Sequence, residues 1–295
     1  MTSNQSNTSS SVAQWSPTFQ CGIWPAVGLV LAFTIWVMIS TTTFTWLFGD
    51  DASVLVESLW TIPSGLVQFG IVAAVYRYDG VTLNEIGLSR RLLRPAAIAV
   101  VGVIVVINAV VVGMGLLAGN EISFGVYAFY QSDPFNFSAT VIAAGAFTTY
   151  AFTGPVEELA FRGYLQNKLI SLFEFSSLRV RTAISIVVTG VIFSALHIPV
   201  ELLVNGTPVS QLAGTLVLLA LSGTIFGTIY ALTQNLYLVV FLHGVGNFWP
   251  LMVDPGQGIW PNYIALLLVY LALIVVYRWV AVRASVPTPS LAAAN

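Results

Sequence analysis

The chain is organised around residues 154–165, which read GPVEELAFRGYL. This stretch places two adjacent carboxylates, Glu157 and Glu158, and the guanidinium of Arg162 in a segment that is otherwise apolar. A charged side chain at membrane depth costs about 3 kcal/mol on insertion scales. Three charges kept together in such a segment need compensation from neighbouring groups, and this arrangement is typical of a functional site in a membrane helix.

The composition around this stretch indicates an integral membrane protein. Of the 295 residues, 57% are hydrophobic and only 7% are charged, whereas a soluble domain carries about 25% charged residues. Only helices and closed barrels satisfy the backbone in lipid, and apolar runs of about 20 residues without alternation exclude a barrel. The predicted fold class is therefore all-α, with about eight transmembrane helices in a bundle. No basic cluster indicates a nucleic-acid partner.

A window of about 20 residues places the spans. They lie near residues 23–47, 54–76, 96–117, 139–173, 181–199, 211–232, 236–249 and 260–279. Residues 77–95 mix leucines with arginines and are predicted to form a short helix on the membrane surface. The loop 119–138 is predicted to fold back over the membrane face. Pro155 is expected to kink the fourth span just before the carboxylates.

These spans divide the chain into four parts. Residues 1–20 are polar and lack a basic start, so they are predicted to be a disordered tail and not a signal peptide. Residues 21–138 hold three transmembrane helices and the surface helix, and residues 139–250 form a catalytic core of four helices. Residues 251–295 contain the last helix and a polar C-terminal tail.

The distribution of Lys and Arg predicts the orientation. Apart from Arg162, every Lys and Arg lies near the C-terminal end of an even-numbered span or in the segment that follows it, and the loops after odd-numbered spans hold acidic residues without any Lys or Arg. Cytoplasmic loops carry the excess of basic residues, so both termini are predicted to be cytoplasmic. The protein is expected in the plasma membrane with its polar cluster facing the cytoplasmic side.

The chain has two histidines, and each lies near the apolar body of a later span. His197 follows Phe193 by four residues, and His243 precedes Asn247 by four. Residues four apart share one face of a helix. Phe193 is therefore expected beside His197, and Asn247 beside His243.

Helix geometry predicts that the charged segment meets a histidine. Glu158 can pair with Arg162 four residues on, which leaves Glu157 turned about 100° away. Glu157 and His197 are each twenty residues from Ser177, in the turn between the fourth and fifth spans. In an antiparallel hairpin both lie about 30 Å above that turn. The two side chains are therefore expected at one level, in the cytoplasmic half of the membrane.

These residue types fit hydrolysis of a peptide bond. A glutamate with a histidine at membrane depth can hold a water molecule and remove its proton. A second histidine with an asparagine supplies N–H donors to the oxyanion that forms when this water attacks a carbonyl. Two histidines and a glutamate also suffice for a zinc site with an open position, here Glu157, His197 and His243. The residues alone leave metal dependence undecided.

The three segments resemble the signature of the CPBP intramembrane protease family, which includes CAAX prenyl endopeptidases of the Rce1 type and bacterial Abi proteins. The signature is Glu-Glu-x-x-x-Arg, then Phe-x-x-x-His, then His-x-x-x-Asn on successive membrane helices. In this chain the motifs occupy residues 157–162, 193–197 and 243–247. The resemblance covers roughly residues 139–249, and the first three spans show no part of the signature.

The resemblance implies a role for each motif position. Glu157 and His197 would activate the water, and His243 and Asn247 would form the oxyanion site. The other positions would orient or support the cluster: Glu158, Arg162, Phe193 and Pro155. The substrate would be a peptide or a lipidated, CAAX-like protein in contact with membrane lipids. Both a metal-dependent and a metal-free glutamate mechanism are argued for the family, so the cofactor stays open between zinc and none.

Two other functional classes use the same residues. The cluster would relay protons or bind a cation in a transporter, or the protein would act by binding alone, as in immunity to a secreted peptide. Inverted repeats would favour a transporter, and none is seen in the sequence. Ser194 and Ser222 lack the Gly-x-Ser-x pattern of a rhomboid-type enzyme, and a zincin-type His-Glu-x-x-His is absent. Every Asp falls in a predicted loop, which argues against a presenilin-like enzyme.

Overall fold

The structure is a computed structural model. It describes residues 17–49, 52–119, 121–122, 124–127, 138–174, 177–203, 205–248, 251–253, 266 and 268–276. Most of the predicted N-terminal tail, most of the loop 119–138, the C-terminal tail and much of the eighth predicted span lie outside these residues.

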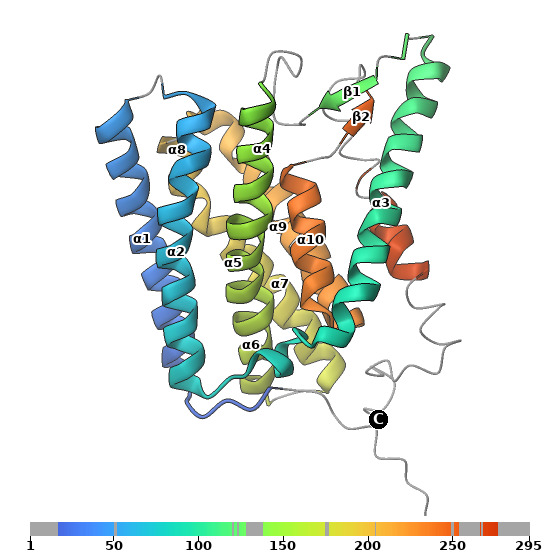
Figure 1. The fold of residues 1–295 in the computed structure, drawn as a ribbon. Coiled ribbons are helices and arrows are strands. Elements are labelled where there is room, and N and C mark those ends of the chain that lie inside the picture. The colour runs from blue at the N-terminus through green and yellow to red at the C-terminus, as the bar shows by residue number, and fades with distance from the viewer. Residues whose placement is uncertain are drawn as a thin grey trace, which may run out of the picture.

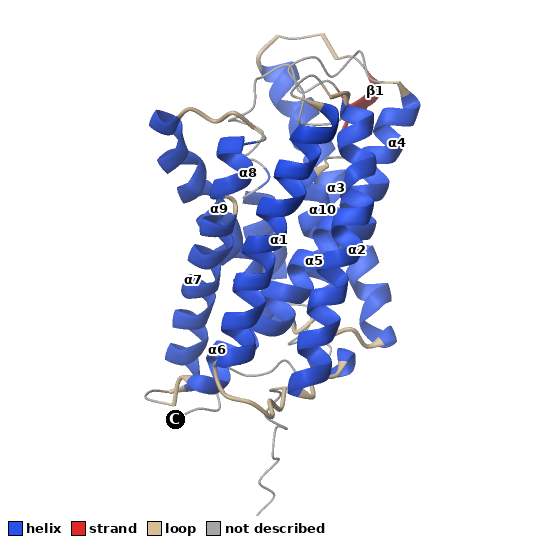
Figure 2. Ribbon diagram, turned by 90° about the vertical axis from the view of Figure 1, so that its left-hand side faces the viewer, coloured by secondary structure: helices blue, strands red, loops and turns tan. Residues whose placement is uncertain are grey.

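The described chain is a bundle of helices that run roughly along one direction (Figures 1 and 2). Its elements are α1 (Trp24–Phe48), α2 (Val54–Asp79), the 3₁₀ turn η1 (Leu83–Ile86), α3 (Arg90–Leu117), β1 (Phe124–Tyr127), α4 (Ala139–Thr148), η2 (Thr149–Thr153), α5 (Gly154–Glu158), η3 (Leu159–Gln166), α6 (Asn167–Leu172), α7 (Leu178–Leu196), α8 (Ile198–Leu203), α9 (Val209–Thr233), α10 (Leu236–Asn247) and β2 (Leu251–Val253). Residues 268–276 are also helical.

The all-α prediction is confirmed apart from one short antiparallel pair, in which β1 and β2 join the chain after α3 to the chain after α10. Within the described residues, five helical segments are long and apolar enough to cross a membrane, and α10 is a shorter apolar helix. The segments are Trp24–Phe48, Val54–Asp79, Leu83–Leu117, Leu178–Leu203 and Val209–Thr233. The protein is therefore a multi-pass membrane protein by length and composition.

The predicted surface helix at residues 77–95 is not formed as one element. Its first residues, 77–79, are the end of α2, and η1 follows as a separate short turn before Gly87. The N-terminus of η1 is capped by Thr82 and Glu85, and the Glu85 carboxylate accepts from the Thr82 N–H at 2.8 Å. α3 then begins at Arg90 and continues through Pro95 into the third predicted span. A proline early in a helix leaves few backbone bonds unmade, so the membrane helix extends down to the arginines.

The fourth predicted span is one helical column from residue 139 to residue 172, made of α4, η2, α5, η3 and α6. Two of its pieces, η2 and η3, are π-helical. At the end of η2 the Gly154 N–H donates to the Thr149 carbonyl, five residues back. Such wide turns absorb a residue that cannot bond in the α pattern. Pro155 therefore widens the column locally and does not end it.

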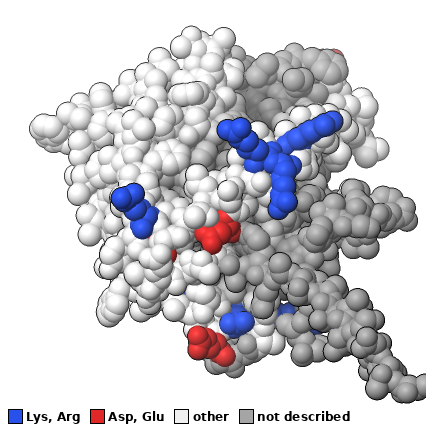
Figure 3. Space-filling model, turned by 60° about the horizontal axis from the view of Figure 1, so that its bottom comes forward, with Lys and Arg blue, Asp and Glu red and all other residues white. Residues whose placement is uncertain are grey.

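Three turns that were predicted to be cytoplasmic lie at one end of the bundle (Figure 1). The α9–α10 turn is bonded to the segment before α3: the Leu236 N–H donates to the Gly87 carbonyl at 3.3 Å, and Asn235 Nδ2 donates to the Leu92 carbonyl at 3.0 Å. The side chains of Lys and Arg gather on the face at this end (Figure 3). We call it the basic end of the bundle.

Lys168 does not belong to that charged face. Its ammonium is fully buried and lies 2.6 Å from the equally buried Asp79 carboxylate. The same carboxylate accepts from the Tyr164 hydroxyl at 2.6 Å and from the Cys21 N–H at 2.7 Å, and Lys168 also donates to the Cys21 carbonyl. This cluster ties the segment before α1 to α2, η3 and α6.

Candidate active site

The column carries its charges into the interior of the bundle. Glu158 and Arg162 have no exposed side-chain surface, and Arg162 Nη1 lies 2.9 Å from Glu158 Oε1. The i,i+4 pair that the spacing predicts is therefore present. Arg162 Nη2 also donates to the Gly223 carbonyl on α9 at 3.0 Å. The guanidinium thus joins the column to α9 as well as neutralising Glu158.

Two aromatic rings enclose the guanidinium. Its carbon Cζ lies 5.0 Å from the centroid of Phe193 on α7 and 5.6 Å from that of Phe226 on α9. Both separations are within the range of cation–π attraction, which strengthens when the cation is desolvated. Phe193 is a predicted supporting residue. Phe226 is not, because nothing in its local sequence shows that α9 packs against η3.

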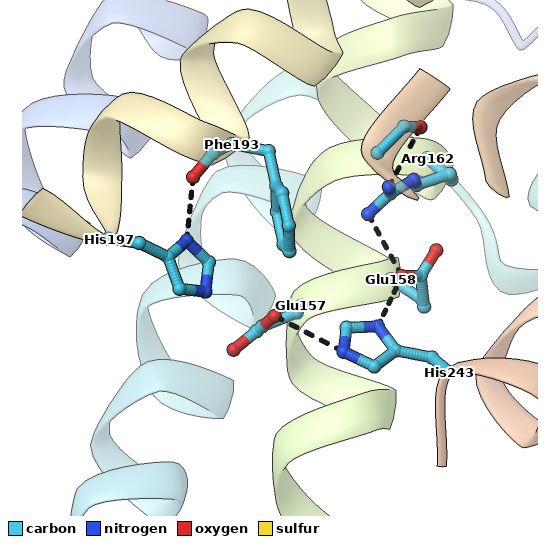
Figure 4. Close-up of polar contacts among 7 residues, drawn as sticks. Glu157, Glu158, Arg162, Phe193, His197 and His243 are labelled. Atoms are coloured by element: carbon cyan, nitrogen blue, oxygen red, sulfur yellow. Dashed lines mark hydrogen bonds and ion pairs between the residues drawn. The ribbon is translucent and has the colours of Figure 1, made fainter. Parts of the chain in front are cut away.

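His243 reaches the same carboxylate from α10 (Figure 4). Its Nδ1 lies 2.6 Å from Glu158 Oε1, and its Nε2 lies 3.6 Å from Glu157 Oε2. A carboxylate oxygen accepts, so the Nδ1 carries the proton and donates. The ring is buried and stacks on Phe226 with centroids 5.3 Å apart. Glu158 is therefore the link between the arginine and this histidine.

Two glycines allow α10 to come so close. A Cβ on Gly154 would stand 3.2 Å from the Val240 carbonyl oxygen, and a Cβ on Gly244 would overlap the Tyr150 ring. Larger residues at these positions would push α10 away from α5 and η2. The close approach is what brings His243 within hydrogen-bond reach of Glu158.

His197 lies at the end of α7, where its Nδ1 is 2.8 Å from the Phe193 carbonyl oxygen. A carbonyl accepts, so Nδ1 donates and the Nε2 of the neutral ring is left with a free lone pair. The ring also packs against Phe193, with centroids 4.5 Å apart. The sequence motif Phe-x-x-x-His thus fixes both the position and the tautomer of this histidine.

The two adjacent carboxylates have different surroundings. Glu158 is fully buried and holds two cationic or N–H donors, whereas the side chain of Glu157 is 19% exposed. Among the described residues, neither Glu157 Oε2 nor Glu158 Oε2 has a hydrogen-bond donor, and the contact of Glu157 Oε2 with His243 is at ion-pair distance only. The difference between the two carboxylates is therefore in burial and in the two contacts of Glu158 Oε1. The other oxygen of Glu157 points to the side on which His197 lies (Figure 4). Glu157 is therefore the carboxylate left open to a further group.

The structure does not join Asn247 to this cluster. It is the last residue of α10, one turn beyond His243 and half-buried, and its side chain has no hydrogen-bond partner within the described part of the chain. The residues also do not assemble the predicted zinc site. Across the ranges that the structure describes, no three His, Cys, Asp or Glu side chains are grouped closely enough to hold a metal ion.

One of three comparisons with known proteins identifies a similar family. Residues 138–249 match the family model described as Type II CAAX prenyl endopeptidase Rce1-like. Searches among curated proteins and among solved structures found no match. The matched range contains the whole cluster, from Glu157 to Asn247. Residues 138–249 are therefore similar to the Rce1-like family of CAAX prenyl endopeptidases, within a chain whose helices are those of a multi-pass membrane protein by length and composition.

Proposed function

We propose that the protein is an intramembrane endopeptidase in which Glu157 and His197 activate a water molecule. The observation that carries this proposal is the contrast between the two carboxylates. Glu158 is fully buried and its Oε1 is held by Arg162 and His243, whereas the side chain of Glu157 is 19% exposed and one of its oxygens points to the side on which His197 lies. A carboxylate that is held in place but not neutralised can act as a general base.

The reaction follows from these positions. His197 Nε2 accepts a hydrogen bond from the water and orients it, while Glu157 takes a proton as the water oxygen attacks the carbonyl carbon. The carbonyl becomes a tetrahedral oxyanion that accepts N–H bonds from His243 and Asn247. Glu157 then passes its proton to the amine as the C–N bond breaks. One water is consumed, and one carboxylic acid and one amine are released.

His243 is held for this role by the contact between its Nδ1 and Glu158, which leaves its Nε2 as the nitrogen nearer to Glu157. Arg162 and Glu158 act as positioning residues, because they hold His243 and do not reach the substrate.

The substrate proposed is a membrane-associated or lipidated, CAAX-like peptide. The test incubates purified protein in detergent with a farnesylated reporter peptide, its unlipidated twin and a panel of hydrophobic peptides, and the products are identified by mass spectrometry. Cleavage is expected, and a chelator is expected to leave the rate unchanged. If the folded protein cleaves none of these peptides, a binding or transport role replaces the enzyme.

We also propose eight spans with both termini in the cytoplasm, in the plasma membrane, and a site facing the cytoplasmic side. The support is that exposed arginines lie at the basic end (Figure 3) and that His243 is about two turns from the link 234–235 at that end.

Reporter fusions test this topology. A fluorescent protein fused after Asn295 is expected to be bright, and alkaline phosphatase fused there is expected to be inactive. Phosphatase inserted at Gly206, in the loop between α8 and α9, is expected to be active. The reverse pattern would overturn the orientation.

A further inference from the structure

A second set of polar atoms lies buried between the column and α7. Four side chains have a nitrogen or oxygen without a hydrogen-bond partner among the described residues: Arg162 Nε, Gln166 Oε1, Ser185 Oγ and Thr189 Oγ1. Each side chain is no more than 1% exposed. We call these four residues the η3–α7 seam. An unsatisfied buried polar group costs about 1–3 kcal/mol, so native structures rarely leave four together.

The seam runs along two packed helices toward the active site. On α7, Thr189 is one turn from Phe193, whose ring contacts the Arg162 guanidinium, and Ser185 is one turn further on. On η3, Gln166 is one turn beyond Arg162. The amide of Gln166 donates to the Gly227 carbonyl at 3.1 Å, which holds its oxygen inside the bundle. The polar atoms therefore follow the helices from Ser185 toward Arg162.

The two hydroxyls on α7 differ from the other helical threonines. A buried threonine in a helix usually donates to the carbonyl four residues earlier. Thr182 does so to Leu178 at 2.8 Å, and the same bond is made by Thr224, Thr228 and Thr233. Thr189 and Ser185 make no such bond within the described chain. Their hydroxyls are therefore left free for a ligand inside the protein.

We propose that the η3–α7 seam binds internal water molecules and supplies the water that Glu157 activates. Polar buried sites with several donors and acceptors are where ordered internal waters are found. The supply role rests on the proposed function, because each cleavage would consume one water in an apolar bundle. The seam ends at Arg162, which is bonded to Glu158 beside the open carboxylate.

Replacement of Thr189 by valine tests the proposal, since valine keeps the shape and removes the hydroxyl. If the seam holds water, Thr189→Val removes a hydrogen-bond partner of that water, so the Tm is expected to fall. The value of kcat is expected to fall about fivefold or more, with KM unchanged. Thr182→Val is the matched control, because that hydroxyl is already satisfied on the same face. In a dry seam, the valine would instead raise the Tm and leave kcat unchanged, which would overturn the proposal.

A measurement that does not depend on peptide cleavage tests the water-binding seam separately from the proposed peptidase activity. Radiolytic hydroxyl labelling marks side chains beside bound water even when they are buried. Labelling is expected at Leu165 and Ile186, which are buried near the seam, and not at Leu242, which is buried on α10. Labelling that is lost in Thr189→Val supports the seam even if no peptide is cleaved. Cleavage by a protein whose seam is unlabelled would leave the enzyme standing and remove the seam.

Discussion

Glu157→Gln is expected to lower kcat by about 10²- to 10⁴-fold, because the amide cannot accept the proton of the attacking water. The substitution keeps the shape of the side chain. It also leaves the Glu158–Arg162 pair and the Glu158–His243 bond untouched. Rates of peptide cleavage are measured for purified protein in detergent, with thermal unfolding recorded on the same samples.

The matched control for this prediction is Glu174→Gln. Glu174 is exposed after α6 and lies outside the cluster, so this variant is expected to keep the full rate. The Tm of Glu157→Gln is also expected to stay near that of the unmodified protein, since its carboxylate holds no hydrogen-bonded partner at Oε2. A rate within threefold of the unmodified protein would remove Glu157 from the role of base.

Arg162→Leu is expected to destabilise the protein by about 3–5 kcal/mol, because it leaves the buried Glu158 carboxylate without its cation. It also removes the bond to the Gly223 carbonyl and the contacts with the two phenylalanine rings. Cleavage is expected to be lost together with stability, since Glu158 then no longer fixes His243. Denaturant titration in mixed micelles measures the free energy of unfolding.

Two further variants separate charge from packing. Arg94→Leu removes an exposed arginine and is expected to change stability by about 0.5 kcal/mol or less. The double variant Glu158→Leu with Arg162→Leu removes both charges and is expected to recover much of the loss, because a buried pair can be replaced by apolar groups at little cost. A single variant as stable as the unmodified protein would contradict the buried ion pair.

The site was predictable from the sequence where local geometry decides it. The four-residue spacing predicts the Glu158–Arg162 pair, and the structure contains it. Equal spacing about Ser177 predicts that Glu157 and His197 lie at one level, and Figure 4 shows their side chains near each other. Both arguments need only the rise of a helix and a hairpin. Both arguments apply here because the helices are long and successive helices pack antiparallel, so the rise per residue fixes the level of each side chain.

Contacts between distant parts of the chain were not predictable in this way. The sequence groups Lys168 with the basic residues that predict the orientation, yet its buried ammonium is paired with Asp79, 89 residues away. The pairing of β1 with β2 likewise joins segments on either side of residues 139–249. Local hydropathy contains no signal for such partners. The same reason explains why Phe226 was missed beside Arg162.

The π-helical turns also escaped the prediction. The sequence shows a proline at residue 155 and predicts a kink, whereas η2 and η3 spread the distortion over wide turns on both sides of the carboxylates. Wide turns are frequent at functional sites because they let consecutive side chains face different partners. Here the fully buried Glu158 faces Arg162 and His243, and the neighbouring Glu157 is partly exposed.

The most direct test of the account is a double-mutant cycle between Glu157 and His197. The value of kcat is measured for the unmodified protein, Glu157→Gln, His197→Ala and the double variant, all with the same peptide. If both residues act on one water molecule, the double variant is expected to be about as slow as the slower single variant. Losses that multiply in the double variant, or an active double variant, would show that the two side chains do not share the water.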